Sequence, residues 1–182
     1  MTNTESKFYA LLESSSRPIL ADGAMGTMLH GHGVGFDQCF DALNLSDPAI
    51  VGDIHRTYID AGAQIIFSNT FGANRYKLSE HGMEDMVAEI NRAGVELARR
   101  VVSGAFKNVL VAGDVGPLGV RLAPYGRVKP EQARDAFTEQ ISALCEAGAD
   151  FLVIETFGDL YEIREAITAA KNFCDLPIVA TM

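Results

Sequence analysis

The sequence predicts an α/β fold in which parallel strands alternate with helices around one hydrophobic core. Three observations predict it. Short apolar runs recur along the chain, stretches with helical periodicity separate them, and one strand-containing segment is repeated at a fixed spacing. Short runs that are apolar throughout are typical of strands buried on both faces of a parallel sheet. Their alternation with helices is typical of consecutive β/α units.

Five apolar runs are the expected strands. Each is short, is rich in Val, Ile, Leu or Phe, and ends at a polar or small residue. These features are typical of strands that end at a functional edge of a parallel sheet. The expected strands are residues 18–22, 65–68, 109–114, 151–154 and 177–181.

Four helical stretches separate these strands. Asp47 followed by Pro48 gives the first helix a capping side chain and a proline in its first turn, and Pro130 begins the third. Apolar residues three or four positions apart mark the inward face of each helix. The expected inward residues are Ile50, Ile54, Tyr58 and Ala61; Met83, Met86 or Val87, Ile90, Leu97 and Val101; Ala133, Phe137, Ile141 and Leu144; and Leu160, Ile163, Ile167 and Ala170.

Residues 60–72 and 146–158 match each other at a constant offset of 86 residues, which spans two β/α units. An open doubly wound sheet and a closed barrel both contain such units. The repeat favours the barrel, because alternate strands of a (β/α)8 barrel supply the same layer of side chains. A barrel needs eight strands and about 250 residues. We therefore expect a truncated (β/α)8 barrel with about the first five strands and four helices.

The expected domain organisation is simple. Residues 1–17 form a polar N-terminal segment or helix, and residues 18–182 form the N-terminal part of one barrel domain. The N-terminus lacks the apolar core of a signal peptide, and no apolar run approaches the roughly 20 residues that span a bilayer. Cys39, Cys145 and Cys174 are odd in number and widely spaced, which argues against a disulfide framework. These features predict a cytoplasmic protein.

The charge of the chain excludes two classes of partner. The net charge is −9 and the pI is about 4.8, and no cluster of basic residues interrupts this acidity. Nucleic acids and anionic membrane surfaces are both bound through clustered basic side chains. We therefore expect no nucleic-acid and no membrane partner.

Polar residues follow the expected strands at the edge where ligands of α/β proteins bind. Several carboxylates on one rim suit a cationic group such as an α-amine, and they also suit a general base or a hard metal ion. The alternative is that each strand-end Asp or Asn only caps the next helix. The strand-end residues are Asp22, Asn69, Thr70, Asp114, Glu155 and Thr156.

The turn at residues 23–27 follows the first strand and consists mainly of small residues. Such a turn before a short helix brings backbone N–H groups close to an anion, although a simple tight turn explains it equally. His30 and His32 lack a further ligand at suitable spacing, so loop roles are favoured over a metal site. His55 lies beside Arg56 on a helix, which predicts a solvated side chain. Cys145 and Cys174 are expected to be small apolar residues of helices.

Five motifs in this order resemble the homocysteine S-methyltransferase family, and most of all the N-terminal domain of its cobalamin-dependent methionine synthases. The resemblance covers nearly the whole chain after about residue 17. The motifs lie at residues 19–27, 43–45, 68–75, 113–117 and 155–157.

The resemblance implies methyl transfer to the thiol of homocysteine, which gives methionine. It also implies a zinc ion that holds the thiol as a thiolate, with cysteine ligands on later strands. No residue of this chain occupies those positions, so we assign no metal ligand and no catalytic residue, and we expect the isolated chain to be inactive. Cobalamin and methyltetrahydrofolate would act through other domains. The implied substrate-binding residues are Asp22, Gly23, Ala24, Asn69, Thr70, Asp114 and Glu155.

Two alternatives remain open at this point. One is a non-catalytic half barrel that binds amino acids or assembles with another chain, since open sheet edges favour self-association. The other is a barrel enzyme that uses a hard metal such as Mg²⁺ bound by Asp22, Asp114 and Glu155.

Overall fold

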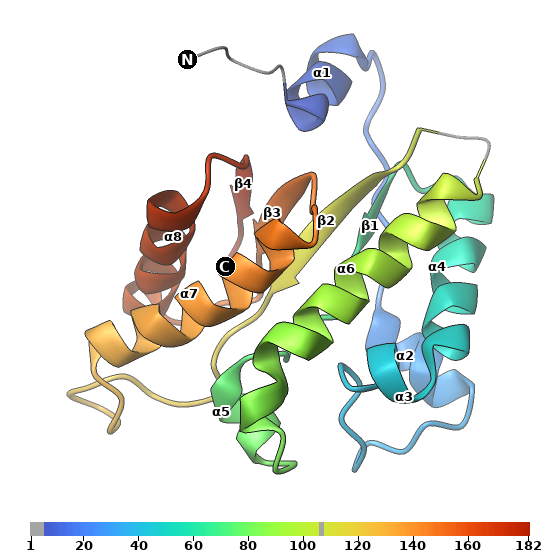
Figure 1. Cartoon of the computed structure of the whole chain (residues 1–182). Coiled ribbons are helices and arrows are strands. Elements are labelled where there is room, and N and C mark those ends of the chain that lie inside the picture. Colours follow the sequence, from blue (N-terminus) through green and yellow to red (C-terminus); the bar gives the residue numbers. More distant parts are fainter. Residues whose placement is uncertain (1–5, 106–107) are drawn as a thin grey trace.

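The computed structural model describes residues 6–105 and 108–182, and it contains one parallel sheet (Figure 1). The strands lie side by side in sequence order, β1-β2-β3-β4, and every neighbouring pair is parallel. This arrangement confirms the α/β class and four of the expected strands. Residues 1–5 of the expected N-terminal segment lie outside the described residues. The strands are β1 (Ile65–Phe67), β2 (Leu110–Val115), β3 (Phe151–Ile154) and β4 (Ile178–Ala180).

The expected first strand, residues 18–22, forms only an isolated bridge between Ala21 and Ile65. The N–H of Asp22 donates to the carbonyl of Ile65 at 2.9 Å, so the segment still runs parallel to β1. Leu20 is 56% exposed and therefore lacks the packing that supports a regular strand. The prediction of a full strand was wrong, but the position of Asp22 at its end was right.

The four long helices are confirmed. Asp47 caps the first of them by accepting a hydrogen bond from the N–H of Ile50. The second begins at Val87 and not at Met83, because a 3₁₀ turn, η1 (Glu84–Met86), precedes it. The long helices are α4 (Pro48–Ala61), α6 (Val87–Ser103), α7 (Pro130–Glu146) and α8 (Leu160–Phe173). Shorter helices are α1 (Lys7–Ser14), α2 (Met25–Gly31), α3 (Leu43–Ser46) and α5 (Arg75–Ser79).

The inward face of α4 differs from the prediction. Its fully buried residues include Val51, Ile54 and His55, whereas Ala61 is exposed. The apolar stripe is therefore rotated from the one that the sequence suggested. The expectation that His55 is solvated was wrong, because its side chain is completely buried. None of the helices in the described part of the chain is long and apolar enough to span a membrane.

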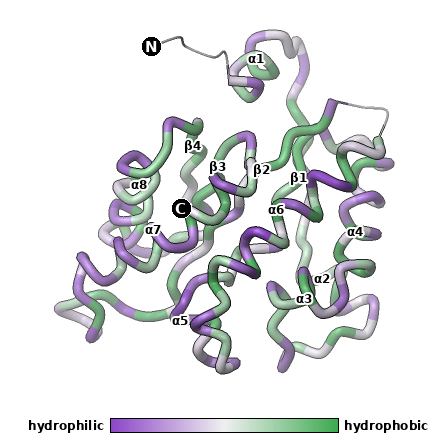
Figure 2. Tube along the Cα trace, viewed as in Figure 1, coloured by the Kyte–Doolittle hydropathy of each residue, from purple (hydrophilic) through white to green (hydrophobic). Residues whose placement is uncertain are grey.

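The two faces of the sheet are covered differently. Strand residues such as Ile66, Val111 and Leu152 pack against α4, α6, α7 and α8 in one core. The other face is lined by a smaller cluster in which Phe8 of α1 stacks on Phe151, with ring centroids 4.2 Å apart. Figure 2 shows the hydrophobic strands beside helices with hydrophilic stretches. A doubly wound sheet has helices on both faces, so this one-sided cover argues against that alternative.

Candidate functional site

A cavity of about 670 Å³ lies where the carboxyl ends of the strands meet. This end of the sheet is opposite the end that lies beside α1 (Figure 1), and residues of α2 and α5 line the cavity. All the residues that the sequence placed in a substrate site line this one cavity. They are Asp22, Gly23, Ala24, Asn69, Thr70, Asp114 and Glu155.

Three carboxyl side chains, Asp22, Asp114 and Glu155, bring acidic oxygens to the cavity. Asp22 Oδ2 accepts a hydrogen bond from the N–H of Phe67 at 3.0 Å. Its Oδ1, and Oδ1 of the 6%-exposed Asp114, are buried without a hydrogen-bond partner among the described residues. A buried polar atom without a partner is costly in free energy, so both atoms are suited to receive a ligand's donors.

Burial changes the acidity of all three groups. The pKa of Asp22 is raised to about 7, chiefly by desolvation and to a smaller extent by the neighbouring Glu155. Desolvation and then Glu155 raise the pKa of Asp114 well above its ordinary value. Burial also raises the pKa of Glu155. Desolvation and like charges both disfavour the ionised form, so the cluster would be stabilised by a cation.

Asn69 and Thr70 line the cavity, but the structure uses their polar atoms internally. Asn69 Nδ2 donates to the carbonyl of Phe40 at 2.7 Å and to Asn44 Oδ1 at 3.3 Å. Thr70 Oγ1 donates to the carbonyl of Asp114 at 2.8 Å. These two residues therefore shape the wall of the cavity, and Asn69 fixes the loop that contains Phe40.

The turn at Gly23 and Ala24 is held against α4. Tyr58 donates its hydroxyl hydrogen to the carbonyl of Ala24 at 3.4 Å. A Cβ atom at position 23 would lie 3.0 Å from the Tyr58 hydroxyl oxygen, so glycine allows the two segments to approach closely. The turn thereby keeps its main chain beside the cavity, ahead of α2.

Thr156 follows Glu155 and has a φ of 61°, in the left-handed region that β-branched residues rarely adopt. The chain turns here so that Glu155 lines the cavity while Phe157 is buried in the helix-side core, 5.9 Å from Phe137 between ring centroids. Backbone strain of this kind is concentrated at functional sites. The strain supports a role for the adjacent Glu155.

The sequence reading missed Asp41 and Lys77, which also line the cavity. Asp41 Oδ1 accepts a hydrogen bond from the N–H of Gly72 at 2.9 Å. Burial raises the pKa of Asp41 to about 6, and Lys77 and His81 oppose that rise. Lys77 also lies over the ring of Phe71, 4.5 Å from its centroid. Both residues adjoin matched motifs, and that proximity was the signal available to find them.

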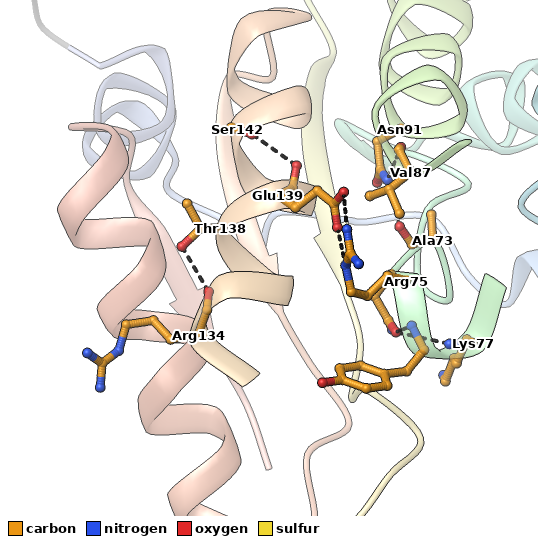
Figure 3. A network of polar contacts seen from close by, with 11 residues as sticks. Ala73, Arg75, Lys77, Val87, Asn91, Arg134, Thr138, Glu139 and Ser142 are labelled. Atoms are coloured by element: carbon orange, nitrogen blue, oxygen red, sulfur yellow. Dashed lines mark hydrogen bonds and ion pairs between the residues drawn. The ribbon is translucent and has the colours of Figure 1, made fainter. Parts of the chain in front are cut away.

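The short helix α5, which carries Lys77, is fixed from outside the cavity (Figure 3). Arg75 forms a two-pronged ion pair with Glu139 of α7, with both N–O distances at 2.8 Å. Asn91 of α6 donates to the carbonyls of Ala73 and Val87, each at 2.7 Å. These contacts anchor α5 and the segment that precedes it to two long helices, so this part of the cavity wall is preorganised.

The residues at the cavity do not fit a metal centre. Within residues 6–105 and 108–182, no group of three or more His, Cys, Asp or Glu side chains is arranged to hold a metal ion. Cys39 lines the cavity, but burial and the neighbouring Asp41 raise the pKa of its thiol. The arrangement argues against the Mg²⁺ alternative for Asp22, Asp114 and Glu155. These carboxyl groups are better suited to an organic cation.

Comparison with known proteins assigns the chain to a family. The family model described as homocysteine S-methyltransferase matches residues 19–182. The chain belongs to the homocysteine S-methyltransferase family. It is 32% identical to the methionine synthases of Mycobacterium tuberculosis, over 167 residues and 87% of its length, and of Mycobacterium leprae, over 172 residues and 89%. It spans 14% of the length of each of those two proteins.

The fold is similar to that of a solved member of the family. The homocysteine methyltransferase MmuM from Escherichia coli, in its oxidised form, superimposes with a TM-score of 0.81 at 26% identity. The match covers 94% of this chain and 63% of that one. The metallated form of MmuM gives a TM-score of 0.80 at 26% identity, covering 93% of this chain and 64% of that one.

Proposed function

We propose that the cavity binds the amino-acid end of homocysteine and that the chain serves methyl transfer to the homocysteine thiol, which yields methionine. The observation that carries this proposal is the cluster of Asp22, Asp114 and Glu155, which has buried oxygens without partners and a shortage of positive charge. The α-ammonium group of an amino acid has three N–H donors and one positive charge. It can therefore donate hydrogen bonds to the carboxyl oxygens without partners and also neutralise part of their negative charge.

The proposed binding mode uses two parts of the cavity. Asp22 and Glu155 receive the ammonium group, since the partnerless Oδ1 of Asp22 is available as an acceptor. The main chain of Gly23 and Ala24 lies near the substrate carboxylate, and Asn69 and Thr70 form the wall between the two. This placement holds the amino acid by both charged ends and leaves its thiol side chain free to extend from them.

Thiol activation is a separate part of the family reaction. The metallated form of MmuM supports a metal, with zinc as our proposal, which would hold the thiol as a thiolate. The described residues do not provide a group for that ion. We therefore derive no step through it and assign this chain's own residues to recognition and orientation of the substrate. Cobalamin as the methyl carrier and methyltetrahydrofolate as its source remain part of the proposal for the methionine synthases.

We further propose that the sheet belongs to a closed (β/α)8 barrel, of which this chain forms about the first five strands. Ile65 pairs with Leu110, whereas its repeat counterpart Phe151 pairs with Ala112, two residues further along β2. An eight-stranded barrel with a shear of about eight displaces equivalent residues by about one per strand. Two strands then give a displacement of about two residues, and the observed register supports this geometry.

Calorimetric titration with L-homocysteine tests the binding proposal. Asp22→Asn and Glu155→Gln should each weaken binding roughly 10- to 150-fold, because a charge-assisted hydrogen bond in a buried site contributes about 1.5–3 kcal/mol. An analogue without the α-amine should bind the unmodified protein with a similar loss.

The matched control is Asp150→Asn. Asp150 accepts a hydrogen bond from the N–H of Val111 and pairs with Lys7, and it does not line this cavity. Its substitution should leave the affinity for homocysteine unchanged. Equal affinities for Asp22→Asn, Glu155→Gln and the unmodified protein would remove both carboxylates from the site.

A further inference from the structure

Gln140 is a polar residue on the core-facing side of α7. It lies three residues after Phe137 and four before Leu144, and all three side chains are fully buried. An amide in such a position costs free energy unless it is hydrogen-bonded. Gln140 Nε2 donates to the carbonyl of Thr70 at 2.7 Å, so the amide holds the segment that follows β1.

This hydrogen bond leaves the other polar atom of the amide unpaired. The Thr70 carbonyl can only accept, so the amide nitrogen must face it and Gln140 Oε1 must point elsewhere. Oε1 is buried and has no hydrogen-bond partner among the described residues. The Thr70 carbonyl, in contrast, also accepts from the N–H of Ala73 at 3.0 Å. An apolar side chain at position 140 would therefore leave that carbonyl paired and would remove one unpaired oxygen.

Thr70 connects Gln140 to the cavity. Its Oγ1 donates to the carbonyl of Asp114 at 2.8 Å and lies 2.7 Å from Ser68 Oγ, which accepts from the N–H of Asp114 at 3.1 Å. Each hydroxyl group has one hydrogen, so Ser68 donates to Thr70 while Thr70 donates to Asp114. Both main-chain polar groups of Asp114 are thereby fixed. Its side chain, 6% exposed, lines the cavity.

Thr70 is held between two helices. It is completely buried, and a Cβ atom at Gly94 of α6 would lie 2.7 Å from Thr70 Cγ2, so the methyl group packs closely against that helix. Gln140 holds its main chain from α7. In the described part of the chain, Gln140 is not among the residues that line the cavity. It therefore reaches a ligand through Thr70 and Asp114 and not by contact.

We propose that Gln140 is a positioning residue for the substrate: it fixes Thr70, and the Thr70 hydroxyl fixes Asp114 within the acidic cluster that receives the substrate ammonium. The inference rests on the proposed function of the cavity. The amide contributes little to folding, because its unpaired Oε1 offsets a hydrogen bond to a carbonyl that has another donor. Stability and substrate binding should therefore respond differently to its loss.

Gln140→Met removes the amide and keeps a side chain of similar size. It should weaken L-homocysteine binding about three- to tenfold in calorimetric titration, because a hydrogen bond that orders the site is lost. The midpoint of urea denaturation should shift by less than about 0.5 M. The matched control is Gln132→Met in the same helix. Gln132 Oε1 accepts from the N–H of Lys129 at the start of α7, so this substitution should lower stability and leave the affinity unchanged.

Substitutions at Thr70 test the route. Thr70→Val removes the hydroxyl that holds Asp114 and should lose at least as much affinity as Gln140→Met, whereas Thr70→Ser keeps the hydroxyl and should retain most of the affinity. In Thr70→Val, the addition of Gln140→Met should cause no further loss. Losses that multiply independently, an unchanged affinity in Gln140→Met, or a urea midpoint lowered by more than about 0.5 M in that variant would each contradict the inference.

Amide hydrogen exchange of the ligand-free protein keeps the inference distinct from the proposed function. In Gln140→Met the N–H of Asp114 should exchange at least about tenfold faster, because its acceptor Ser68 Oγ is held less firmly, whereas the N–H of Leu152 in β3 should be unaffected. If exchange is faster and the unmodified protein does not bind L-homocysteine, the proposed function fails while the coupling of Gln140 to Asp114 stands. If L-homocysteine binds and the exchange at Asp114 is unchanged, the inference about Gln140 is wrong.

Discussion

Asp22 should destabilise the empty protein, and Asp22→Asn should therefore stabilise it. Burial raises the pKa of Asp22 from 3.8 to about 7. Between these values the folded state binds more protons than the unfolded state, so the free energy of unfolding falls as the pH rises through this window. The shift is about three pKa units, and each unit corresponds to about 1.36 kcal/mol. The full penalty of about 4 kcal/mol is reached above pH 7.

The amide of Asn keeps an acceptor for the N–H of Phe67 and carries no charge, so Asp22→Asn should remove this penalty. Because solvent at the mouth of the cavity screens part of the charge, we expect a gain of about 2–4 kcal/mol at pH 8. A pH of 5 lies only about one unit above the pKa of 3.8 that Asp22 has in the unfolded state, so the gain in the free energy of unfolding should fall to about 1.5 kcal/mol or less. The same substitution should weaken homocysteine binding, which is a trade of stability for function.

Urea denaturation at pH 5 and pH 8 measures both gains. Asp150→Asn is the control, because Asp150 has cationic partners, Lys7 and Arg99, and its substitution should lower stability. A variant Asp22→Asn that is no more stable than the unmodified protein at pH 8, or a gain that is equal at both pH values, would refute the reasoning.

Other parts of the molecule give three further predictions. The side chain of His55 is buried without a partner among the described residues, and burial lowers its pKa from 6.5 to about 4. As the pH falls, the unfolded state therefore binds a proton at His55 before the folded state does, and the free energy of unfolding should fall by about 2 kcal/mol between pH 7.5 and 5. Urea denaturation of His55→Leu should not show that loss. The Sγ atoms of Cys145 and Cys174 are 2.8 Å apart, so excess oxidised glutathione should oxidise them to a disulfide and itself be reduced to two glutathione thiols. Mass spectrometry should then show that the protein has lost two hydrogens, and an unchanged mass would contradict the prediction. Gly94→Ala should lower stability by about 1–3 kcal/mol despite a better helix propensity, because the new Cβ would lie 2.7 Å from Asn44 Nδ2; unchanged stability would mean that this packing adapts.

Much of the fold could be predicted because strand runs and helical periods are local features of the sequence. The starts of α4 and α7 followed from Asp47, Pro48 and Pro130. The buried face of α4 could not be predicted fully, since a histidine beside Arg56 reads as hydrated and only tertiary packing encloses it. Residues 18–22 were predicted as a full strand but form only an isolated bridge, because regular strand pairing depends on neighbouring segments as well as on an apolar run.

The position of the candidate site was predictable for a general reason. The carboxyl ends of parallel strands meet at one edge, so Asp22, Asp114 and Glu155 had to lie near one another. The repeat placed Asn69 and Glu155 at corresponding strand ends, but it could not reveal that the side-chain amide of Asn69 donates a hydrogen bond to the carbonyl of Phe40. Hydrogen-bond partners from distant loops leave no periodic signal.

Asp41 was missed for the same physical reason. It comes from an irregular loop between α2 and α3, and its place in the cavity depends on the N–H of Gly72. The closeness of Cys145 and Cys174 was also missed, because they are separated by a strand and a helix that only the folded chain brings back together. Neither contact follows from spacing along the sequence.

A crystal structure of the protein with L-homocysteine bound tests the central claim most directly. We predict that the substrate ammonium lies within hydrogen-bonding distance of the carboxyl groups of Asp22 and Glu155, with the substrate carboxylate beside the main chain of Gly23 and Ala24. Homocysteine bound outside this cavity, or bound in it with its carboxylate against Glu155, would contradict the account.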